Sequence, residues 1–259
     1  MTDPSVLDNP MLLSILFHPR SASPGQGEQA AILDGTLPVE EHTGNGYRLF
    51  VHEPGAPVIL YFHGNGEIAA DYDGIAPAYK DVGASLLVVD YRGYGWSTGE
   101  PRISTLLPDA EAVATKCPEV LKNAGLENSP LFIMGRSLGS APAIHLAHKF
   151  PQMFKGVIIE SGFFETHPLL RTLGLPDGLI EGVPDPIEND RKVREISLPL
   201  LIIHGEQDFL IPVTNGQSLF DACPSESKRI VRIANAGHND LLFYGVEEYF
   251  RAIKTFLGL

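Results

Sequence analysis

The chain has 259 residues, which is enough for one large α/β domain or two small ones with a sizeable core. Hydrophobic residues make up 44% and charged residues 20% of the sequence, as is ordinary for a globular protein that folds in water. The net charge of −13 argues against nucleic acids and anionic membrane surfaces as partners.

Short apolar runs alternate with helical patterns along most of the chain. Residues 40–43 and 47–53 flank Gly44-Asn45-Gly46, so we predict a β-hairpin that turns at these glycines. Apolarity, length and β-branching predict further strands at residues 58–62, 86–89, 131–134, 157–159, 200–203 and 229–233. Helices are predicted at residues 68–80 (kinked or ended by Pro77), 105–123, 141–150, 214–222 and 246–257. This alternation indicates an α/β fold, a mostly parallel sheet of about eight strands with helices on both faces.

Two segments depart from the alternation. Residues 1–35 have no clear element, and we treat them as an N-terminal extension of a domain that covers residues 36–259. Residues 163–197 contain four prolines and no clear strand, and an insertion of this length is usually functional. We interpret it as a small lid above the edge of the sheet. The alternative is a packed connection with no role in substrate binding.

The most informative motif is Gly135-Arg136-Ser137-Leu138-Gly139, which stands between a predicted strand and a predicted helix. That setting is typical of a nucleophile elbow, a tight turn that presents a serine at the edge of the sheet. Glycine on both sides lets the backbone and the helix approach closely. Gly95-Trp96-Ser97-Thr98-Gly99 fits the same pattern, but its preceding strand ends too early and Pro101 interrupts the segment after it. We therefore predict that Ser97 is a loop residue.

A serine hydroxyl becomes an effective nucleophile when a base takes its proton and a third group orients that base. Among nine histidines, His238 is the candidate base, because it follows the last predicted strand and open α/β sheets hold their sites in such loops. The alternative is a histidine that caps the last helix. Asp208, which follows the strand predicted at 200–203, is the candidate acid, and Glu206 and Glu160 are alternatives.

The negative charge that develops on a substrate carbonyl needs two fixed donors. We expect these to be the backbone N–H groups of Leu138 and of Asn65, which follows the strand predicted at 58–62. The alternative is that this second loop is simply a turn. Apolar residues of the insertion are candidates for binding an acyl group, or else they pack the insertion onto the domain: Phe163, Phe164 and Leu169.

Together these residues resemble the α/β-hydrolase superfamily over residues 35–259. The resemblance rests on His63-Gly64-Asn65, the loop from Asp90 to Ser97, the elbow, His204-Gly205-Glu206-Gln207-Asp208 and Gly237-His238-Asn239-Asp240. The Tyr-Arg-Gly-Tyr-Gly-x-Ser loop and the Gly-His-Asn-Asp ending look like the subgroup of serine-aminopeptidase-type hydrolases and protein depalmitoylases.

The resemblance implies hydrolysis of an ester, thioester or amide without a cofactor. It also implies a triad of Ser137, Asp208 and His238, with the Asn65 and Leu138 amides as the oxyanion hole. Residues 1–35 lack the cysteine cluster expected of a palmitoylated depalmitoylase. Serine at the elbow also argues against a haloalkane dehalogenase, which resembles this fold but uses aspartate there.

We therefore expect a serine hydrolase that cleaves a carboxylic ester or thioester of a small-molecule acyl substrate through an acyl-enzyme on Ser137. One alternative is an aminopeptidase or amidase, and another is a non-catalytic binding protein of the same fold. A third is a metal-dependent hydrolase using His204, Asp208, His238 and Asp240, but the sequence has no His-x-x-x-His or comparable ligand pair. We expect no metal.

Cysteine usage and hydropathy suggest where the protein works. Cys117 and Cys223 form no disulfide framework, so we expect a reducing, cytoplasmic location, with a single disulfide as the alternative. The apolar residues 11–17 are too short to span a bilayer and lack the basic start of a signal peptide. We expect no stable membrane insertion, and the sequence leaves the oligomeric state open.

Overall fold

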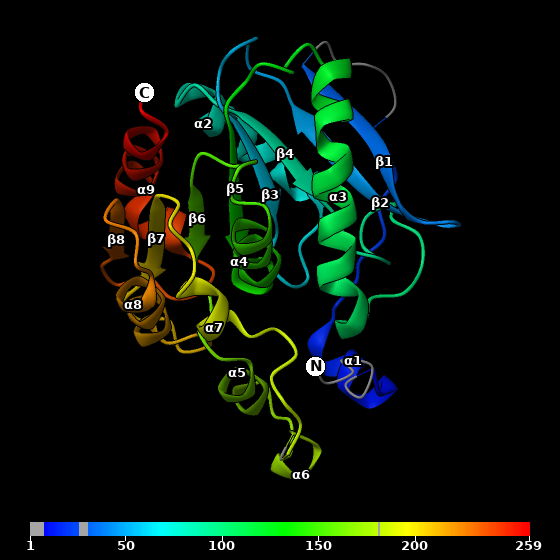
Figure 1. The fold of residues 1–259 in the computed structure, drawn as a ribbon, viewed down its shortest axis with the longest axis vertical. Helices are drawn as coiled ribbons and strands as arrows, with labels where there is room; N and C mark the ends of the chain where they lie inside the picture. Colours follow the sequence, from blue (N-terminus) through cyan, green and yellow to red (C-terminus); the bar gives the residue numbers. More distant parts are fainter. Residues whose placement is uncertain (1–7, 26–30, 181) are drawn as a thin grey trace.

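The computed structural model describes residues 8–25, 31–180 and 182–259, which form an eight-stranded sheet (Figure 1). The strand order is β1-β2-β4-β3-β5-β6-β7-β8. The strands are β1 (Ile32–Glu40), β2 (Thr43–Phe50), β3 (Val58–Phe62), β4 (Ser85–Val89), β5 (Leu131–Arg136), β6 (Val157–Glu160), β7 (Leu200–Gly205) and β8 (Lys228–Ile233). β1 pairs with β2, and β2 with β4, in antiparallel fashion, and the other neighbours are parallel. The predicted mostly parallel sheet is confirmed.

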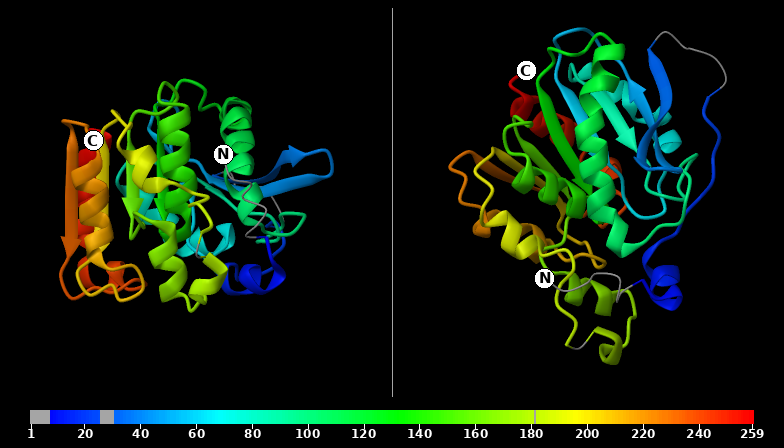
Figure 2. Two further views of the ribbon diagram at one scale, coloured as in Figure 1. Left: turned by 60° about the horizontal axis from the view of Figure 1, so that its bottom comes forward. Right: turned by 45° about the vertical axis from the view of Figure 1, so that its right-hand side comes forward.

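Helices cover both faces of the sheet, as Figures 1 and 2 show. On one face, α3 (Ile103–Asn123), α4 (Ser140–Lys149) and α8 (Val213–Ala222) pack against side chains such as Leu60 and Ile133. On the other face, α2 (Ala76–Asp81) and α9 (Leu241–Leu257) pack against side chains such as Ile59 and Met134. Because successive residues of a strand point to opposite faces, the parallel strands are apolar almost throughout. This arrangement confirms the predicted fold class.

The hairpin forms, but its turn was predicted at the wrong place. Glu40 pairs with Thr43, so the chain reverses at residues 41–42, and Gly44 and Gly46 lie inside β2. A Cβ on Gly46 would lie 2.7 Å from Nε1 of Trp96, and one on Gly44 would lie 2.4 Å from Cγ2 of Thr36. These glycines therefore serve close packing against other segments and not a turn.

Two helices also differ from their predicted extents. The segment predicted as one helix over 68–80 contains a 3₁₀ helix, η2 (Ala69–Gly74), followed by α2. Pro77 lies in the first turn of α2, where its missing N–H is not needed by the helix. α9 begins at Leu241, five residues earlier than predicted, and is interrupted at Gly245, which has a non-helical backbone (φ −145°, ψ 36°).

The helix of the N-terminal extension and the insertion lie at one end of the molecule (Figures 1 and 2). The N-terminal part contains α1 (Pro10–Leu16), and the predicted boundary at residue 35 falls inside β1. The insertion contains α5 (Thr166–Thr172), α6 (Asp177–Ile180) and α7 (Asn189–Val193). In the described ranges, we find no helix that combines the length and apolarity needed to cross a membrane.

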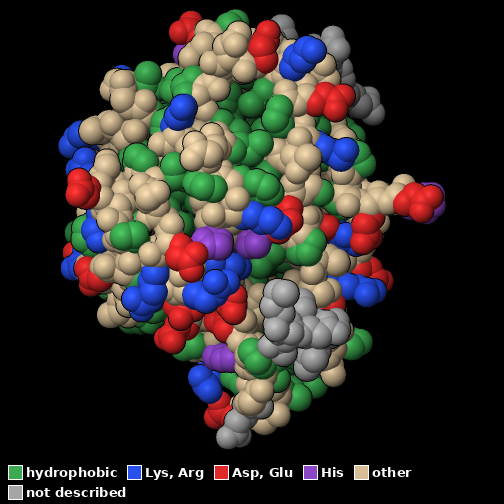
Figure 3. All heavy atoms as spheres, in the orientation of Figure 1, with side chains coloured by type: hydrophobic (Ala, Val, Ile, Leu, Met, Phe, Trp, Pro, Cys, Tyr) green, Lys and Arg blue, Asp and Glu red, His purple; other side chains and the backbone are tan. Residues whose placement is uncertain are grey.

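Side chains of both charges are mixed over the face that carries α3 and α4 (Figure 3). Two histidines of α4 belong to this surface. His145 Nε2 lies 2.8 Å from Glu111, and His148 Nε2 lies 2.8 Å from Glu195. Both are engaged by surface carboxylates, as expected for histidines that do not act as the base.

Candidate active site

The turn at Ser137 has the backbone of a nucleophile elbow. Ser137 follows the last residue of β5 and begins a 3₁₀ helix, η3 (Ser137–Gly139), which leads into α4. Its φ of 52° lies in the left-handed region, which costs a non-glycine residue about 1–3 kcal/mol. A Cβ on Gly135 would lie 2.0 Å from the Gly139 carbonyl oxygen, and one on Gly139 would lie 2.0 Å from the Phe62 carbonyl oxygen. Both positions therefore require glycine.

The structure brings together the three side chains predicted to act on the substrate. His238 Nε2 lies 2.9 Å from Ser137 Oγ, and His238 Nδ1 lies 2.8 Å from Asp208 Oδ2. The other oxygen, Asp208 Oδ1, accepts hydrogen bonds from the backbone N–H groups of Leu210 and Ile211. Burial alone would raise the pKa of Asp208, but its hydrogen bonds with His204 and His238 outweigh burial and lower it. Asp208 is therefore held as a carboxylate beside the imidazole.

The alternative acids lie elsewhere. Glu160 ends β6, where its carboxylate accepts hydrogen bonds from Arg136 Nε at 2.9 Å and Tyr249 Oη at 2.6 Å. Glu206 is exposed. Asp240, which was considered only for the metal-dependent alternative, accepts the backbone N–H of Gly237. Among the residues with described positions, no three His, Cys, Asp or Glu side chains are grouped so that they could hold a metal ion.

Ser97 lies in a loop, as predicted. Its Oγ accepts the backbone N–H of Gly46 at 2.7 Å, and its own N–H donates to the Tyr94 carbonyl. The second Gly-x-Ser-x-Gly match is thus part of the contact between this loop and β2.

The two N–H groups predicted for an oxyanion hole belong to residues that line one cavity with Ser137, namely Asn65 and Leu138. Within the described ranges, neither N–H has a hydrogen-bond acceptor in the protein. Both polar atoms of the Asn65 side chain are hydrogen-bonded. Its Oδ1 accepts from His18 N at 3.0 Å and Tyr94 Oη at 2.7 Å, and its Nδ2 donates to the Leu16 carbonyl at 2.9 Å.

The cavity beside Ser137 has a volume of about 90 Å³ and is lined mainly by apolar side chains. Phe163 and Leu169 of the insertion, two of the three residues predicted to bind substrate, line this cavity. Phe164 does not, because it points elsewhere and the Arg194 guanidinium lies 5.8 Å from its ring centre. The end of α1 contributes Leu16 and Phe17, which sequence reasoning had left out of the site. Their only sequence signal is that they end the apolar run at 11–17.

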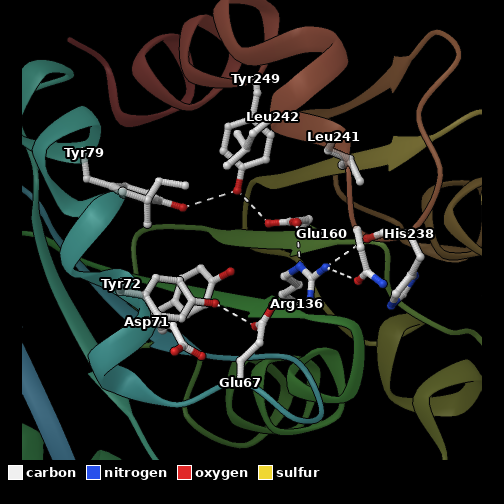
Figure 4. A pocket seen from close by; sticks show the side chains of 13 residues that line it. Glu67, Asp71, Tyr72, Tyr79, Arg136, Glu160, His238, Leu241, Leu242 and Tyr249 are labelled. Atoms are coloured by element: carbon white, nitrogen blue, oxygen red, sulfur yellow. Dashed lines mark hydrogen bonds and ion pairs between the residues drawn. The ribbon is translucent and has the colours of Figure 1, made fainter.

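A second cavity of about 280 Å³ lies beside His238 and is lined by charged and tyrosine side chains (Figure 4). Arg136, the residue just before Ser137, forms its wall together with Glu67 and Glu160. Sequence reasoning assigned no role to Arg136. The available signal was a charged residue at the end of an otherwise buried strand, where an uncompensated charge would be costly.

Comparison with known proteins shows a family match over part of the chain. The model of the family "Serine aminopeptidase, S33" matches residues 53–183, slightly more than half of the chain. The match includes Asn65 and Ser137 and ends before Asp208. Human alpha/beta hydrolase domain-containing protein 17B is 29% identical over 206 residues, which cover 77% of this chain and 66% of that protein. The chain thus spans slightly less than two thirds of that relative.

Solved structures share the fold at low sequence identity. The Pyrococcus furiosus esterase Pf2001 matches with a TM-score of 0.72 and 18% identity, over 94% of this chain and 97% of that one. The Paleococcus ferrophilus monoacylglycerol lipase matches with a TM-score of 0.60 and 19% identity, over 83% of this chain and 98% of that one.

Proposed function

Because the chain belongs to the serine aminopeptidase S33 family of hydrolases, we propose that it cleaves a carboxylic ester or thioester through an acyl-enzyme on Ser137. The observation that carries this proposal is the continuous chain of hydrogen-bond distances from Asp208 through His238 to the Ser137 hydroxyl. A serine on a strained elbow, with a base in reach and an acid that orients the base, is the arrangement that activates a hydroxyl.

The proposed reaction has two halves. Asp208 accepts the Nδ1–H of His238, which leaves the Nε2 lone pair to take the proton of Ser137 as the oxygen attacks the acyl carbonyl. The backbone N–H groups of Asn65 and Leu138 hold the resulting oxyanion. His238 then gives its proton to the departing alcohol or thiol, and the acyl group stays on Ser137. Water, deprotonated by His238, releases the acid and regenerates the enzyme.

The apolar cavity supports an uncharged acyl group as the part of the substrate that binds beside Ser137. Its described lining contains no acidic or basic side chain, so a charged substrate group there would be buried without a partner. We propose that residues 163–197 act as a lid, since Phe163 and Leu169 form part of this lining. An esterase and a lipase among the matched structures agree with this substrate class.

Cleavage of an aminoacyl bond is the second candidate, and the family description names it. An aminopeptidase must hold the substrate's ammonium group. Apart from Asp208, which binds the imidazole, the carboxylates that line a cavity with His238 are those of Glu67, Asp71 and Glu160. Asp71 is paired with Arg20. Glu67 and Glu160 there are already paired with Arg136. The acyl site therefore favours an ester or thioester over a peptide.

The thiols bear on where the enzyme works. Cys117 and Cys223 are both free and buried. We propose a reducing compartment such as the cytoplasm, in which free thiols persist.

Covalent labelling tests the proposed function. We expect a fluorophosphonate to label the wild-type protein and the Ser97→Ala variant, but not Ser137→Ala. The same pattern is expected for p-nitrophenyl ester hydrolysis, measured over a series of acyl lengths beside aminoacyl-nitroanilides. Labelling that persists in a folded Ser137→Ala variant contradicts the proposal. Faster cleavage of the nitroanilides than of every ester favours the second candidate.

A further inference from the structure

We propose that Arg136 is a positioning residue, which fixes the loop of His238 and the loop of Asn65 relative to Ser137. This inference rests on the proposed function and adds a residue that touches none of the reacting atoms. Arg136 precedes Ser137 directly, yet its side chain lines the second cavity and not the apolar one (Figure 4).

The Arg136 side chain is 11% exposed, and all three of its nitrogens donate hydrogen bonds. Nε donates to Glu160 Oε1 at 2.9 Å, and Nη1 donates to Glu67 Oε1 at 2.5 Å. Nη2 donates to the His238 carbonyl at 2.9 Å and to Asn239 Oδ1 at 2.8 Å. A buried guanidinium is stable only with such compensation, and here its partners come from three separate loops or strand ends.

The contact with the histidine loop sets the position of the base. Nη2 binds the main-chain carbonyl of His238 and the side chain of the next residue, so it holds the backbone from which the imidazole projects. Because Arg136 is covalently joined to Ser137, this contact relates the imidazole directly to the nucleophile. On the other side of the loop, Asp240 accepts the Gly237 N–H. The Ser137–His238 distance of 2.9 Å therefore depends on a short path through one guanidinium.

The contact with the oxyanion loop runs through Glu67. Its Oε1 accepts a hydrogen bond from Arg136 Nη1. Its Oε2 accepts hydrogen bonds from the backbone N–H of Gly64 at 2.7 Å and from Tyr72 Oη at 2.9 Å. Gly64 precedes Asn65, whose N–H we propose as an oxyanion donor. The guanidinium also packs on this loop, because a Cβ on Gly64 would lie 2.4 Å from Arg136 Nη1.

Charge complementarity explains why an arginine suits this position. Burial alone would raise the pKa of Glu67, but the charge of Arg136 together with the other contacts of the carboxylate, such as the hydrogen bonds from Gly64 and Tyr72, lowers that pKa. The Glu67 carboxylate can therefore face the guanidinium. Glu160 is held in turn by Tyr249 Oη, which ties the group to α9. A lysine ammonium has its three donors on a single nitrogen. It could not reach all of these acceptors, which lie on different sides of the planar guanidinium.

Arg136→Lys is the test variant, because it keeps the positive charge but loses the fork. We expect kcat for a p-nitrophenyl ester and the rate of fluorophosphonate labelling to fall by about 10–100-fold with KM little changed, as for a displaced catalytic group. Glu67→Gln, which can still accept from Gly64 and Tyr72, is expected to lower kcat to a smaller extent. Guanidinium ion added at millimolar concentration to Arg136→Ala should restore part of the labelling rate.

Arg48→Lys is the matched control. Arg48 is equally buried, with a side chain 7% exposed and ion pairs to Asp34 and Asp73, but it lies in β2 away from Ser137. We expect Arg48→Lys to lower the melting temperature and leave kcat unchanged.

Wild-type kcat in Arg136→Lys and Glu67→Gln overturns the inference. The inference is also overturned if Arg136→Ala loses activity that guanidinium does not restore, while Arg136→Lys, like Arg48→Lys, keeps the wild-type kcat. These results are separate from a failure of the proposed function, which the Ser137→Ala labelling decides on its own.

Discussion

Removing the Asn65 side chain should weaken both the fold and the reaction, although the proposed oxyanion donor is a main-chain group that the substitution keeps. The side chain joins the loop after β3 to the end of α1 through His18 N and Leu16 O, and to the loop after β4 through Tyr94 Oη. Leu16 and Phe17, at the end of α1, line the apolar cavity beside Ser137. Asn65→Ala therefore removes the contacts that hold both one wall of the cavity and the loop of the proposed oxyanion donor.

The expected loss depends on which groups remain unpaired. His18 N still donates to Tyr94 Oη at 2.8 Å, so it keeps an acceptor. Tyr94 is 0% exposed, and its hydroxyl proton loses its acceptor. The Leu16 carbonyl loses its donor. An unsatisfied buried group costs about 1–3 kcal/mol and one that water can reach costs less, so we expect a loss of about 2–3 kcal/mol. For a chain of this length, that lowers the melting temperature by about 4–10 °C.

Calorimetry and ester kinetics measure the two effects separately. We expect kcat to fall by about 10-fold, because the N–H remains but its loop is less well fixed. His18→Ala is the control, since the exposed His18 ring makes no hydrogen bond to any residue that the structure describes and only its backbone N–H takes part. An unchanged melting temperature in Asn65→Ala, or an equal loss in His18→Ala, would refute the reasoning.

Two further predictions concern buried titratable groups. Burial lowers the pKa of Lys192 from 10.5 to about 8, so the folded protein binds this proton less tightly than the unfolded chain does and stability rises as pH goes from 8 to 10.5. Lys192→Met removes this buried charge and also the hydrogen bond to the Ile187 carbonyl. We therefore expect it to stabilise the protein at pH 7 by about 1–2 kcal/mol, and thermal denaturation should show a smaller gain at pH 10. A gain that grows with pH contradicts this. Burial raises the pKa of the Cys117 thiol to about 12 and also raises that of Cys223, so neither should react with Ellman's reagent at pH 8 until the protein unfolds; rapid reaction of the native protein would contradict this.

Sequence reasoning found the fold and the three aligned side chains because their signals are local. The apolar run at 58–62 is β3 to the residue, and the elbow is defined by five consecutive residues. Asp208 and His238 are far apart in sequence, but each follows a parallel strand. Since the carboxyl ends of parallel strands lie at one edge of the sheet, the strand assignment alone predicts that they meet.

Features that depend on packing between distant segments were missed or wrong. Gly44-Asn45-Gly46 has the composition of a turn, and only contact with Trp96 and Thr36 shows why glycine is needed there. Phe164 was grouped with its neighbour Phe163 on composition, but only one of them faces the cavity. Sequence reasoning found no role for Arg136, because its four hydrogen-bond acceptors are spread along the chain from Glu67 to Asn239.

The residues that line the apolar cavity come from inside and outside the segment that the family model matches. The matched segment, residues 53–183, carries Ser137, Asn65 and the residues of the insertion that line the apolar cavity up to Leu173. Leu16 and Phe17 lie before it, and Leu210 and Ile211 lie after it, next to the acid. Apolar burial scales with contact area, so replacing a wall side chain changes acyl affinity without touching the hydrogen bonds that activate the serine. In this chain, the proposed chemistry of the elbow and the proposed choice of acyl group therefore depend on different residues, and the end of α1 is one wall at which the acyl group can be selected.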